Sequence, residues 1–160
     1  MSGWTPVLVA VGAAIVVAVA GGVLTTTGPW YRGLRLPSWK PPDWAFGPVW
    51  TTIFTLTVIS GLMAWNGAPN AEARSALLVA YAVNGVLNIA WSGIFFRMRR
   101  PDWALVEVAF LWLSIVALML VTVPISIIAA LLLLPYLAWV SVASYLNLTI
   151  VRMNAPFGAH

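Results

Sequence analysis

Five long apolar stretches constrain this chain more than any other feature. They cover about residues 6–26, 45–65, 75–96, 103–123 and 126–151, and short segments rich in polar residues, proline or glycine separate them. A helix needs about 20 mostly apolar residues to cross a bilayer, and each stretch has that length. We therefore expect an all-α membrane protein, a bundle of five transmembrane helices that forms one domain over residues 1–160.

The composition supports a membrane protein and argues against most catalytic chemistry. Of the 160 residues, 62% are hydrophobic and 8% are charged, whereas soluble domains carry about 25% charged residues. The chain has no cysteine, and its one histidine is His160. We therefore expect no metal site and no nucleophile paired with histidine, hence no catalytic residues of a hydrolase or kinase. The basic residues are scattered over short segments, which argues against nucleic acid as a partner.

Two features of the apolar stretches need interpretation. Stretch 6–26 has no basic residue on its N-terminal side and is longer than the roughly 7–15 apolar residues of a signal peptide, so we expect a permanent helix. Residues 103–140 contain a single charge and are nearly twice the length of one span. Pro124 predicts a turn between the fourth and fifth helices. Pro135 is then expected inside the fifth helix, where neighbouring helices or water can satisfy the carbonyl that it frees.

The distribution of basic residues predicts an orientation in the membrane. Five crossings place the two termini on opposite faces, and Arg74 is alone on the face of the N-terminus. Because cytoplasmic segments carry an excess of Lys and Arg, we expect the N-terminus outside and the other face in the cytoplasm. That face holds the loop after the first helix, the RMRR segment and the C-terminus, with Arg32, Arg35, Lys40, Arg97, Arg99, Arg100 and Arg152.

One face of the third helix carries polar and aromatic residues. Asn84, Asn88, Trp91 and Phe95 follow one another at spacings of four, three and four residues, which places them on one face of a helix. The amides can hydrogen-bond to neighbouring helices, with Gly85 allowing a close approach. They can also line a ligand cavity inside the bundle. Periodicity alone leaves both interpretations open.

Two other helices present aromatic residues at helical spacing. Trp50 and Phe54 share a face of the second helix, and Trp139, Ala143 and Asn147 share a face of the fifth. Tryptophans of membrane proteins usually lie at the headgroup level, but the tryptophans on these three faces fall several residues inside their apolar stretches. A buried indole needs a partner for its N–H group. A cluster of interior indoles therefore favours a large, flat, aromatic ligand.

Two charged features have both a functional and a structural interpretation. Glu107 is an ionisable residue in an apolar stretch, which suggests a functional site. It also lies near Asp102 in the first turns of its helix, where the helix dipole and the interface tolerate a carboxylate. The RMRR segment at residues 97–100 is typical of a solvated cytoplasmic loop that contacts anionic membrane lipid.

Several motifs resemble those of the TspO/MBR family of membrane proteins. They are WYRGLRLPSWKPPDWAFGPVW, NIAWSGIFF in the third helix, WALVE in the fourth, and PYLAW followed by LN and Arg152 in the fifth. The resemblance covers about residues 30–154, in the family's order and spacing. It implies a five-helix bundle, usually a homodimer, in a bacterial cell membrane. It also implies a cavity that binds porphyrins such as protoporphyrin IX as ligands, without an obligatory cofactor.

The resemblance also implies which residues bind the porphyrin. Trp39, in the segment PSWKPP, would belong to a lid over the cavity. The lid is the loop between the first two helices, which we call loop 1. Because prolines restrict the backbone, we expect Pro37, Pro41 and Pro42 to stiffen it. The pocket residues carried over from the family are Trp50, Phe54, Asn88, Trp91, Phe95, Trp139 and Ala143.

Three functions are compatible with this resemblance. The leading hypothesis is a membrane receptor or sensor that binds a porphyrin. The first alternative is light-dependent degradation of the porphyrin, in which Trp50 and Trp139 would donate electrons. The second is a translocator for porphyrins or sterols. Sterol binding is disfavoured because the cholesterol-recognition pattern of the animal proteins has a tyrosine where this chain has Leu148. In addition, six residues separate Tyr145 from Arg152, more than the pattern's limit of about five.

Overall fold

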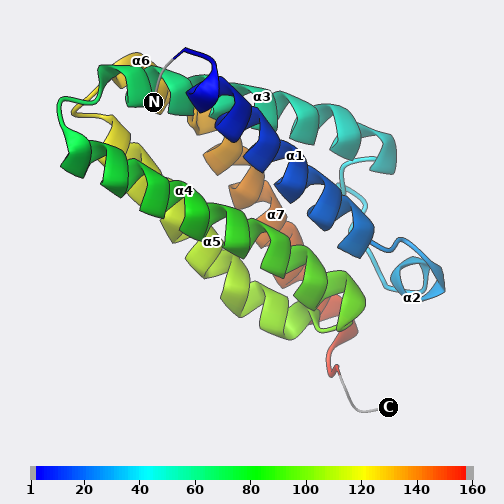
Figure 1. Cartoon of the computed structure of the whole chain (residues 1–160). Coiled ribbons are helices and arrows are strands. Elements are labelled where there is room, and N and C mark those ends of the chain that lie inside the picture. The colour runs from blue at the N-terminus through cyan, green and yellow to red at the C-terminus, as the bar shows by residue number, and fades with distance from the viewer. Residues whose placement is uncertain (1–2, 158–160) are drawn as a thin grey trace.

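The fold is an all-helical bundle. The structure, a computed structural model, describes residues 3–157, so His160 lies outside it, and the described part contains helices and no strands (Figure 1). Within this part, 5 helical segments are long and apolar enough to cross a membrane. The expected bundle of five membrane-spanning helices is thereby confirmed.

The spans overlap the five apolar stretches of the sequence, with ends that differ by a few residues. α2 lies in loop 1, η1 is a π-helical turn that continues α4, and α6 and α7 together make the fifth span. In chain order the elements are α1 (Thr5–Leu24), α2 (Pro29–Arg32), α3 (Asp43–Gly67), α4 (Ala71–Ser92), η1 (Gly93–Arg97), α5 (Pro101–Thr122), α6 (Ile127–Leu131) and α7 (Leu134–Asn154).

Polar residues and prolines between the apolar stretches set where the helices begin. The Asn70 side chain accepts a hydrogen bond from the backbone N–H of Ala73 (2.8 Å) at the start of α4. Ser126 caps α6 in the same way through the N–H of Ala129 (3.1 Å). Such caps satisfy N–H groups that have no partner within the helix. Pro101 occupies the first turn of α5, where a missing N–H group costs nothing.

The fifth span differs from the expectation at Pro135. α6 ends at Leu131, and the chain makes a turn at Leu132 and Leu133 before α7 begins at Leu134. Pro135 therefore lies in the first turn of α7 and not inside a continuous helix. A proline within a helix removes one hydrogen bond and clashes with the carbonyl four residues earlier. The chain avoids this cost by ending one helix and starting another.

α5 is the most buried helix of the bundle, and α1 is the least. α4 and α7 pack against α5, whose buried face includes Ala104, Val108, Leu111, Ile115 and Leu118. In contrast, α1 lies across α3 and α4 (Figure 1) and has no buried residue. Because lipid tails are as apolar as leucine, α1 can remain exposed in a bilayer without a hydrophobic penalty.

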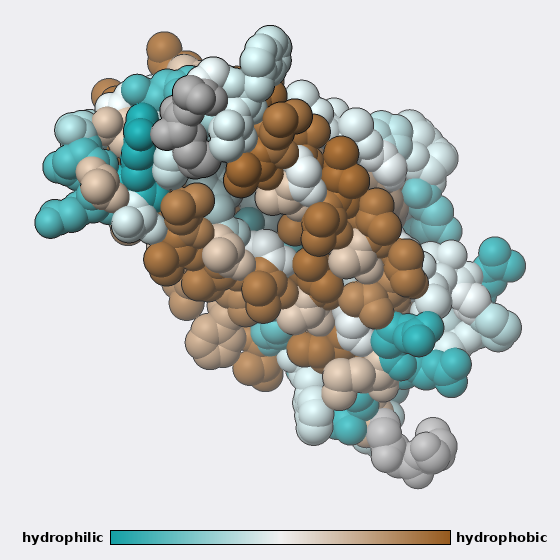
Figure 2. All heavy atoms as spheres, viewed as in Figure 1, coloured by the Kyte–Doolittle hydropathy of each residue, from teal (hydrophilic) through white to brown (hydrophobic). Residues whose placement is uncertain are grey.

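The termini lie at opposite ends of the bundle (Figure 1). Loop 1 is attached to the end of α7, because the N–H of Arg35 donates to Asn154 Oδ1 (2.7 Å) and Asn154 Nδ2 donates to the carbonyl of Arg35 (2.8 Å). Tyr31 of α2 packs against Phe96 of η1 with ring centroids 5.5 Å apart. Loop 1, the RMRR segment and the end of α7 therefore share one end. Figure 2 shows an apolar band between two more polar ends.

Candidate functional site

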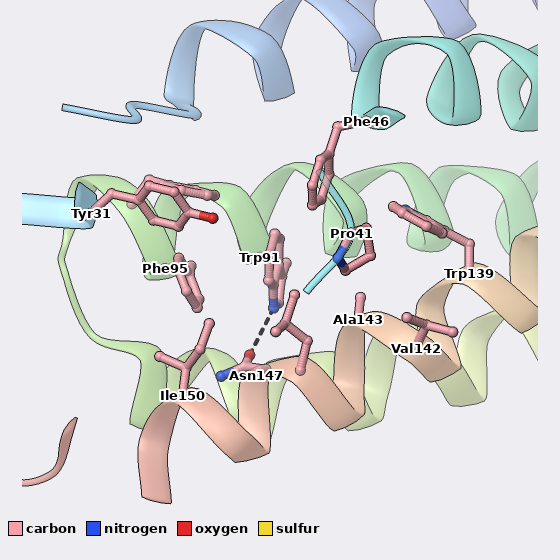
Figure 3. A pocket seen from close by; sticks show the side chains of 12 residues that line it. Tyr31, Pro41, Phe46, Trp91, Phe95, Trp139, Val142, Ala143, Asn147 and Ile150 are labelled. Atoms are coloured by element: carbon pink, nitrogen blue, oxygen red, sulfur yellow. Dashed lines mark hydrogen bonds between the residues drawn. The ribbon is translucent and has the colours of Figure 1, made fainter. Parts of the chain in front are cut away.

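Twelve residues line a pocket at the end of the bundle that carries loop 1 (Figure 3). The cavity has a volume of about 40 Å³, far below the roughly 300–1,000 Å³ of small-molecule sites. This aromatic pocket is therefore narrow, and its own side chains fill most of the space. The lining residues are Tyr31, Pro41, Phe46, Trp91, Phe95, Phe96, Trp139, Val142, Ala143, Leu146, Asn147 and Ile150.

The π-helical turn η1 supplies two neighbouring rings to this pocket. The N–H of Met98 donates to the carbonyl of Gly93, five residues earlier (2.9 Å). Phe95 and Phe96 are both buried, and their ring centroids lie 4.7 Å apart. Trp91 stacks on Phe95 at 5.1 Å. Single π-helical turns occur frequently at functional sites, and no pattern in the sequence indicated this one.

A buried amide holds the indole of Trp91 in place. Trp91 Nε1 donates to Asn147 Oδ1 at 3.0 Å (Figure 3), and Asn147 Nδ2 donates to the carbonyl of Pro101 at 2.8 Å. Asn147 is 1% exposed, so these bonds do not compete with water. They connect α4, α5 and α7 at one point. Asn147 is absent from the carried-over pocket, although its spacing places it on the same helix face as Trp139 and Ala143.

A second polar cluster lies further along the bundle. The Tyr136 hydroxyl donates to Asn84 Oδ1 (3.1 Å) and accepts from Asn88 Nδ2 (2.8 Å). Asn84 Nδ2 donates to Ser114 Oγ (3.1 Å). Both amides of the polar stripe on α4 therefore connect helices, as the packing interpretation requires. Tyr136 was missed in the sequence, although it lies one turn before Trp139 in the motif PYLAW.

The seven pocket residues carried over from the family do not all lie together. Four of them, Trp91, Phe95, Trp139 and Ala143, line the aromatic pocket. The other three, Trp50, Phe54 and Asn88, are not among its lining residues. Trp50 stacks on Phe54 with centroids 5.5 Å apart and meets the edge of Tyr136 at 6.1 Å. Its indole therefore lies behind the pocket, beside the Tyr136 cluster.

Loop 1 covers the aromatic pocket, but Trp39 of its PSWKPP segment does not line that pocket. Trp39 is 45% exposed, and its ring packs against Tyr145 at 5.3 Å. The inner side of the lid consists of Tyr31 and Pro41, with Phe46 of α3 beside them (Figure 3). Burial raises the pKa of the Tyr31 phenol, so this residue is neutral at physiological pH. An amphipathic indole at the interface accounts for the position of Trp39.

A cation lies beside this lid. Lys40 Nζ pairs with Asp43 Oδ1 at 2.5 Å and lies 5.6 Å from the centroid of the Phe46 ring. This pair connects loop 1 to the first turn of α3. It also places a positive charge next to a ring that lines the aromatic pocket.

Glu107 is buried without a polar partner. Both carboxyl oxygens are inaccessible to solvent and make no hydrogen bond within residues 3–157. Ser114 lies seven residues further along α5, on the same helix face, and bonds to Asn84 of α4. Glu107 therefore lies on the side of α5 that faces α4. Its carboxyl oxygens are shielded by the surrounding side chains.

Comparisons with known proteins agree on one family. The model of the TspO/MBR family matches residues 8–153. A tryptophan-rich protein TspO of Chlorobaculum tepidum is 40% identical over 148 residues, which cover 90% of this chain and 92% of that protein. The translocator protein of Homo sapiens is 36% identical over 126 residues, with 78% and 75% covered. A tryptophan-rich sensory protein of Cereibacter sphaeroides is 32% identical over 133 residues, with 83% and 82% covered. With its five membrane-spanning helices, the chain is an integral membrane protein that belongs to the TspO/MBR family.

Proposed function

We propose that the chain is a membrane receptor or sensor that binds a porphyrin in the aromatic pocket. The observation that carries this proposal is the convergence of Trp91, Trp139, Phe46 and Phe95 from three different spans on one pocket. Aromatic rings associate through offset stacking or edge-to-face contacts. A flat macrocycle offers the largest surface for such contacts, so it suits this lining better than an aliphatic ligand does.

The charges near the pocket fit the acidic groups of such a ligand. Protoporphyrin IX carries two carboxylates on one edge of its ring. Lys40 lies beside Phe46 at the lid, and its present partner, Asp43, has a side chain that is 68% exposed. Exchanging that partner for a ligand carboxylate keeps the ammonium group paired. The ligand would then bind with its ring among the aromatic side chains and its carboxylates toward loop 1.

Binding requires the aromatic pocket to open, because about 40 Å³ cannot hold a porphyrin. The bonds of Asn147 to Trp91 and Pro101 hold the three spans behind the pocket together. Loop 1 is held by contacts near the surface of the bundle, among them those of Tyr31, Arg35 and Trp39. The lid is therefore the part that moves, and its displacement would signal that the pocket is occupied.

A titration of the purified protein with protoporphyrin IX tests this function. Binding is followed through quenching of tryptophan fluorescence and the shift of the porphyrin absorption band. We expect Trp139→Phe and Trp91→Phe each to weaken binding by about 3- to 10-fold, because they reduce the aromatic surface. Trp44→Phe is the matched control, since Trp44 is 77% exposed. Equal affinity in all three variants would contradict the proposed site.

The same preparation separates the two competing functions. The protein with bound porphyrin is illuminated in air. Loss of the porphyrin in the original protein, but not in a variant that lacks Trp139, would indicate degradation. Trp139 lines the aromatic pocket and Trp50 does not, so the Trp50→Phe variant would then retain most of that activity. Passage of porphyrin through proteoliposomes that contain the protein would indicate translocation.

We also propose a homodimer in a bacterial cell membrane, with loop 1 in the cytoplasm. The seven basic residues that we expect in the cytoplasm all lie at the end of the bundle that carries loop 1. This distribution supports the proposed orientation. The chain has no cysteine, so Ser38→Cys and Ala71→Cys each introduce a single thiol at opposite ends. In intact cells, a membrane-impermeant maleimide should label only the Ala71→Cys variant. The mass of the protein in lipid nanodiscs tests the dimer.

A further inference from the structure

A second and larger hollow lies in the other half of the bundle. It has a volume of about 540 Å³ and is bounded by the first half of α1, the second half of α3 and the middle of α4. This size falls within the roughly 300–1,000 Å³ of small-molecule sites. Figure 2 shows a recess between α1 and α4 on the apolar face. We call it the α1 cleft.

The α1 cleft is separate from the aromatic pocket. The two hollows share no lining residue. Between them lies the cluster of Tyr136, Asn84 and Asn88, in which Tyr136 bonds to both amides. Tyr136 and Asn84 line the α1 cleft, whereas none of the three lines the aromatic pocket. These mutual hydrogen bonds join α4 to α7 beside the α1 cleft.

The walls of the α1 cleft exclude charged ligands. Its lining within the described part of the chain contains no Asp, Glu, Lys, Arg or His, and α1 contributes mainly alanine and valine. Val9, Val16 and Val86 line the cleft and are 50%, 63% and 67% exposed. The mouth therefore faces the lipid tails, and a ligand enters from the membrane. The carboxylates of a porphyrin would meet no cation in this lining, whereas Lys40 lies beside the aromatic pocket.

One point of the wall is polar and has unused bonding capacity. Thr57 Oγ1 is buried and makes no hydrogen bond within residues 3–157. The adjacent Tyr81 hydroxyl makes a long contact, 3.4 Å, to the carbonyl of Thr57 and lies near the Ser60 side chain. Both residues line the α1 cleft. Buried hydroxyls usually have partners, and rotation of the Thr57 side chain toward the cleft would present its hydroxyl to an oxygen of a ligand.

The shape and the polar point together define the ligand class. The α1 wall runs from Pro6 to Val17, which is about 16 Å at 1.5 Å per residue, so the cleft is elongated. Thr57 lies near the middle of α3, which spans Asp43–Gly67, and thus deep in the membrane where a charged headgroup is costly. We propose that the α1 cleft binds a neutral single-chain lipid with one hydroxyl or carbonyl group, whose oxygen hydrogen-bonds to Thr57 and Tyr81.

Photolabelling with a diazirine-bearing derivative of 1-hexadecanol tests this site in the full-length protein in lipid nanodiscs. Mass spectrometry should locate the label on α1, α3 and α4 around Thr57. Unlabelled 1-hexadecanol should compete, whereas palmitate and protoporphyrin IX should not. Label spread evenly over all lipid-facing helices would show ordinary contact with bulk lipid and would overturn the proposal. Competition by protoporphyrin IX would also overturn it, because it would show one continuous site.

Two variants sharpen the test. Ala14 lines the α1 cleft, so Ala14→Phe fills it and should reduce specific labelling at least 10-fold. Ala18→Phe makes the same change at an exposed position of α1 outside the lining and should leave labelling unchanged. Thr57→Val removes one hydroxyl and should weaken competition by 1-hexadecanol by about 2- to 10-fold. Unchanged labelling in Ala14→Phe, with the fold intact by circular dichroism, would contradict a ligand site in the α1 cleft. This conclusion does not depend on whether the aromatic pocket binds a porphyrin.

Discussion

The two hollows of this protein differ in almost every physical respect. The aromatic pocket is narrow, rich in aromatic rings and backed by α4, α5 and α7, which hydrogen bonds hold together. The α1 cleft is wide and bounded on one side by a helix without a buried residue. Its lining is mainly aliphatic, and its aromatic residues are Phe54, Trp65, Tyr81 and Tyr136. The first hollow has about 40 Å³ and the second about 540 Å³.

This difference shows how two kinds of site arise in one small bundle. Directional bonds and large rings fix the aromatic pocket, so a ligand must displace a lid to enter. In the α1 cleft, lipid tails compete equally well for every apolar surface, so nothing drives α1 to close over α3 and α4. A site of the first kind can report occupancy through a moving loop. A site of the second kind exchanges its contents with the membrane.

The strongest test of this contrast is Asn147→Leu. The substitution leaves the buried N–H of Trp91 without a partner and removes the bond to the carbonyl of Pro101. We expect the free energy of unfolding to fall by about 2–3 kcal/mol, as measured by denaturant titration in detergent micelles. Asn66→Leu, at an exposed position near the end of α3, is the matched control and should change it by less than about 0.5 kcal/mol. Similar effects of both variants would show that the aromatic pocket is not held by this bond.

The lid is tested by replacing both Pro41 and Pro42 with glycine. Each replacement makes loop 1 more costly to order by about 0.4–1 kcal/mol. We therefore expect the affinity for protoporphyrin IX to fall by about 4- to 30-fold in the same fluorescence titration. Pro69→Gly, in the loop between α3 and α4 at the opposite end, should leave it unchanged. An unaltered affinity in the double variant would mean that a stiff loop 1 does not contribute to binding.

A smaller effect is expected at the wall formed by α1. A Cβ atom at Gly85 would lie 3.3 Å from Val17 Cγ2, whereas one at Gly12 meets nothing within 4 Å. Alanine favours a helix over glycine by about 0.5–1 kcal/mol. Gly12→Ala should therefore stabilise the protein by that amount, and Gly85→Ala should show little net change because close packing opposes the gain. Equal stabilisation in thermal unfolding would mean that α1 does not pack against α4 at this point.

The smallest effect is expected for Thr57→Val in the protein without added lipid. The Thr57 hydroxyl makes no hydrogen bond in the described part of the chain, so its removal breaks none. The free energy of unfolding should change by less than about 0.5 kcal/mol. A loss above about 1 kcal/mol would reveal a structural partner and would remove the reason for placing a ligand oxygen there.

Much of the fold and part of the aromatic pocket could be predicted from the sequence. Each apolar stretch is long enough for one span, so the number and approximate limits of the spans follow from the cost of exposing polar groups to lipid. Helical periodicity placed Trp91, Phe95, Trp139 and Ala143 on inward faces. It did so because these residues differ in chemistry from the aliphatic residues around them.

Other features had no signal in the sequence. The break before Pro135 and the π-helical turn at Phe95 and Phe96 depend on local backbone choices that periodicity cannot express. Tyr31 reaches the aromatic pocket because loop 1 packs against η1 and the end of α7, and Phe46 reaches it from the first turn of α3. These contacts join residues that are far apart in the chain.

The sequence by itself determined that this chain crosses a membrane five times and carries seven of its eight basic residues at one end. Only the tertiary structure decided that one hollow is narrow and the other wide. The physical reason is that hydropathy cannot tell a helix face that meets another helix from one that meets lipid, because both surroundings are equally apolar. That choice depends on shape and on a few hydrogen bonds, which exist only once the helices are assembled.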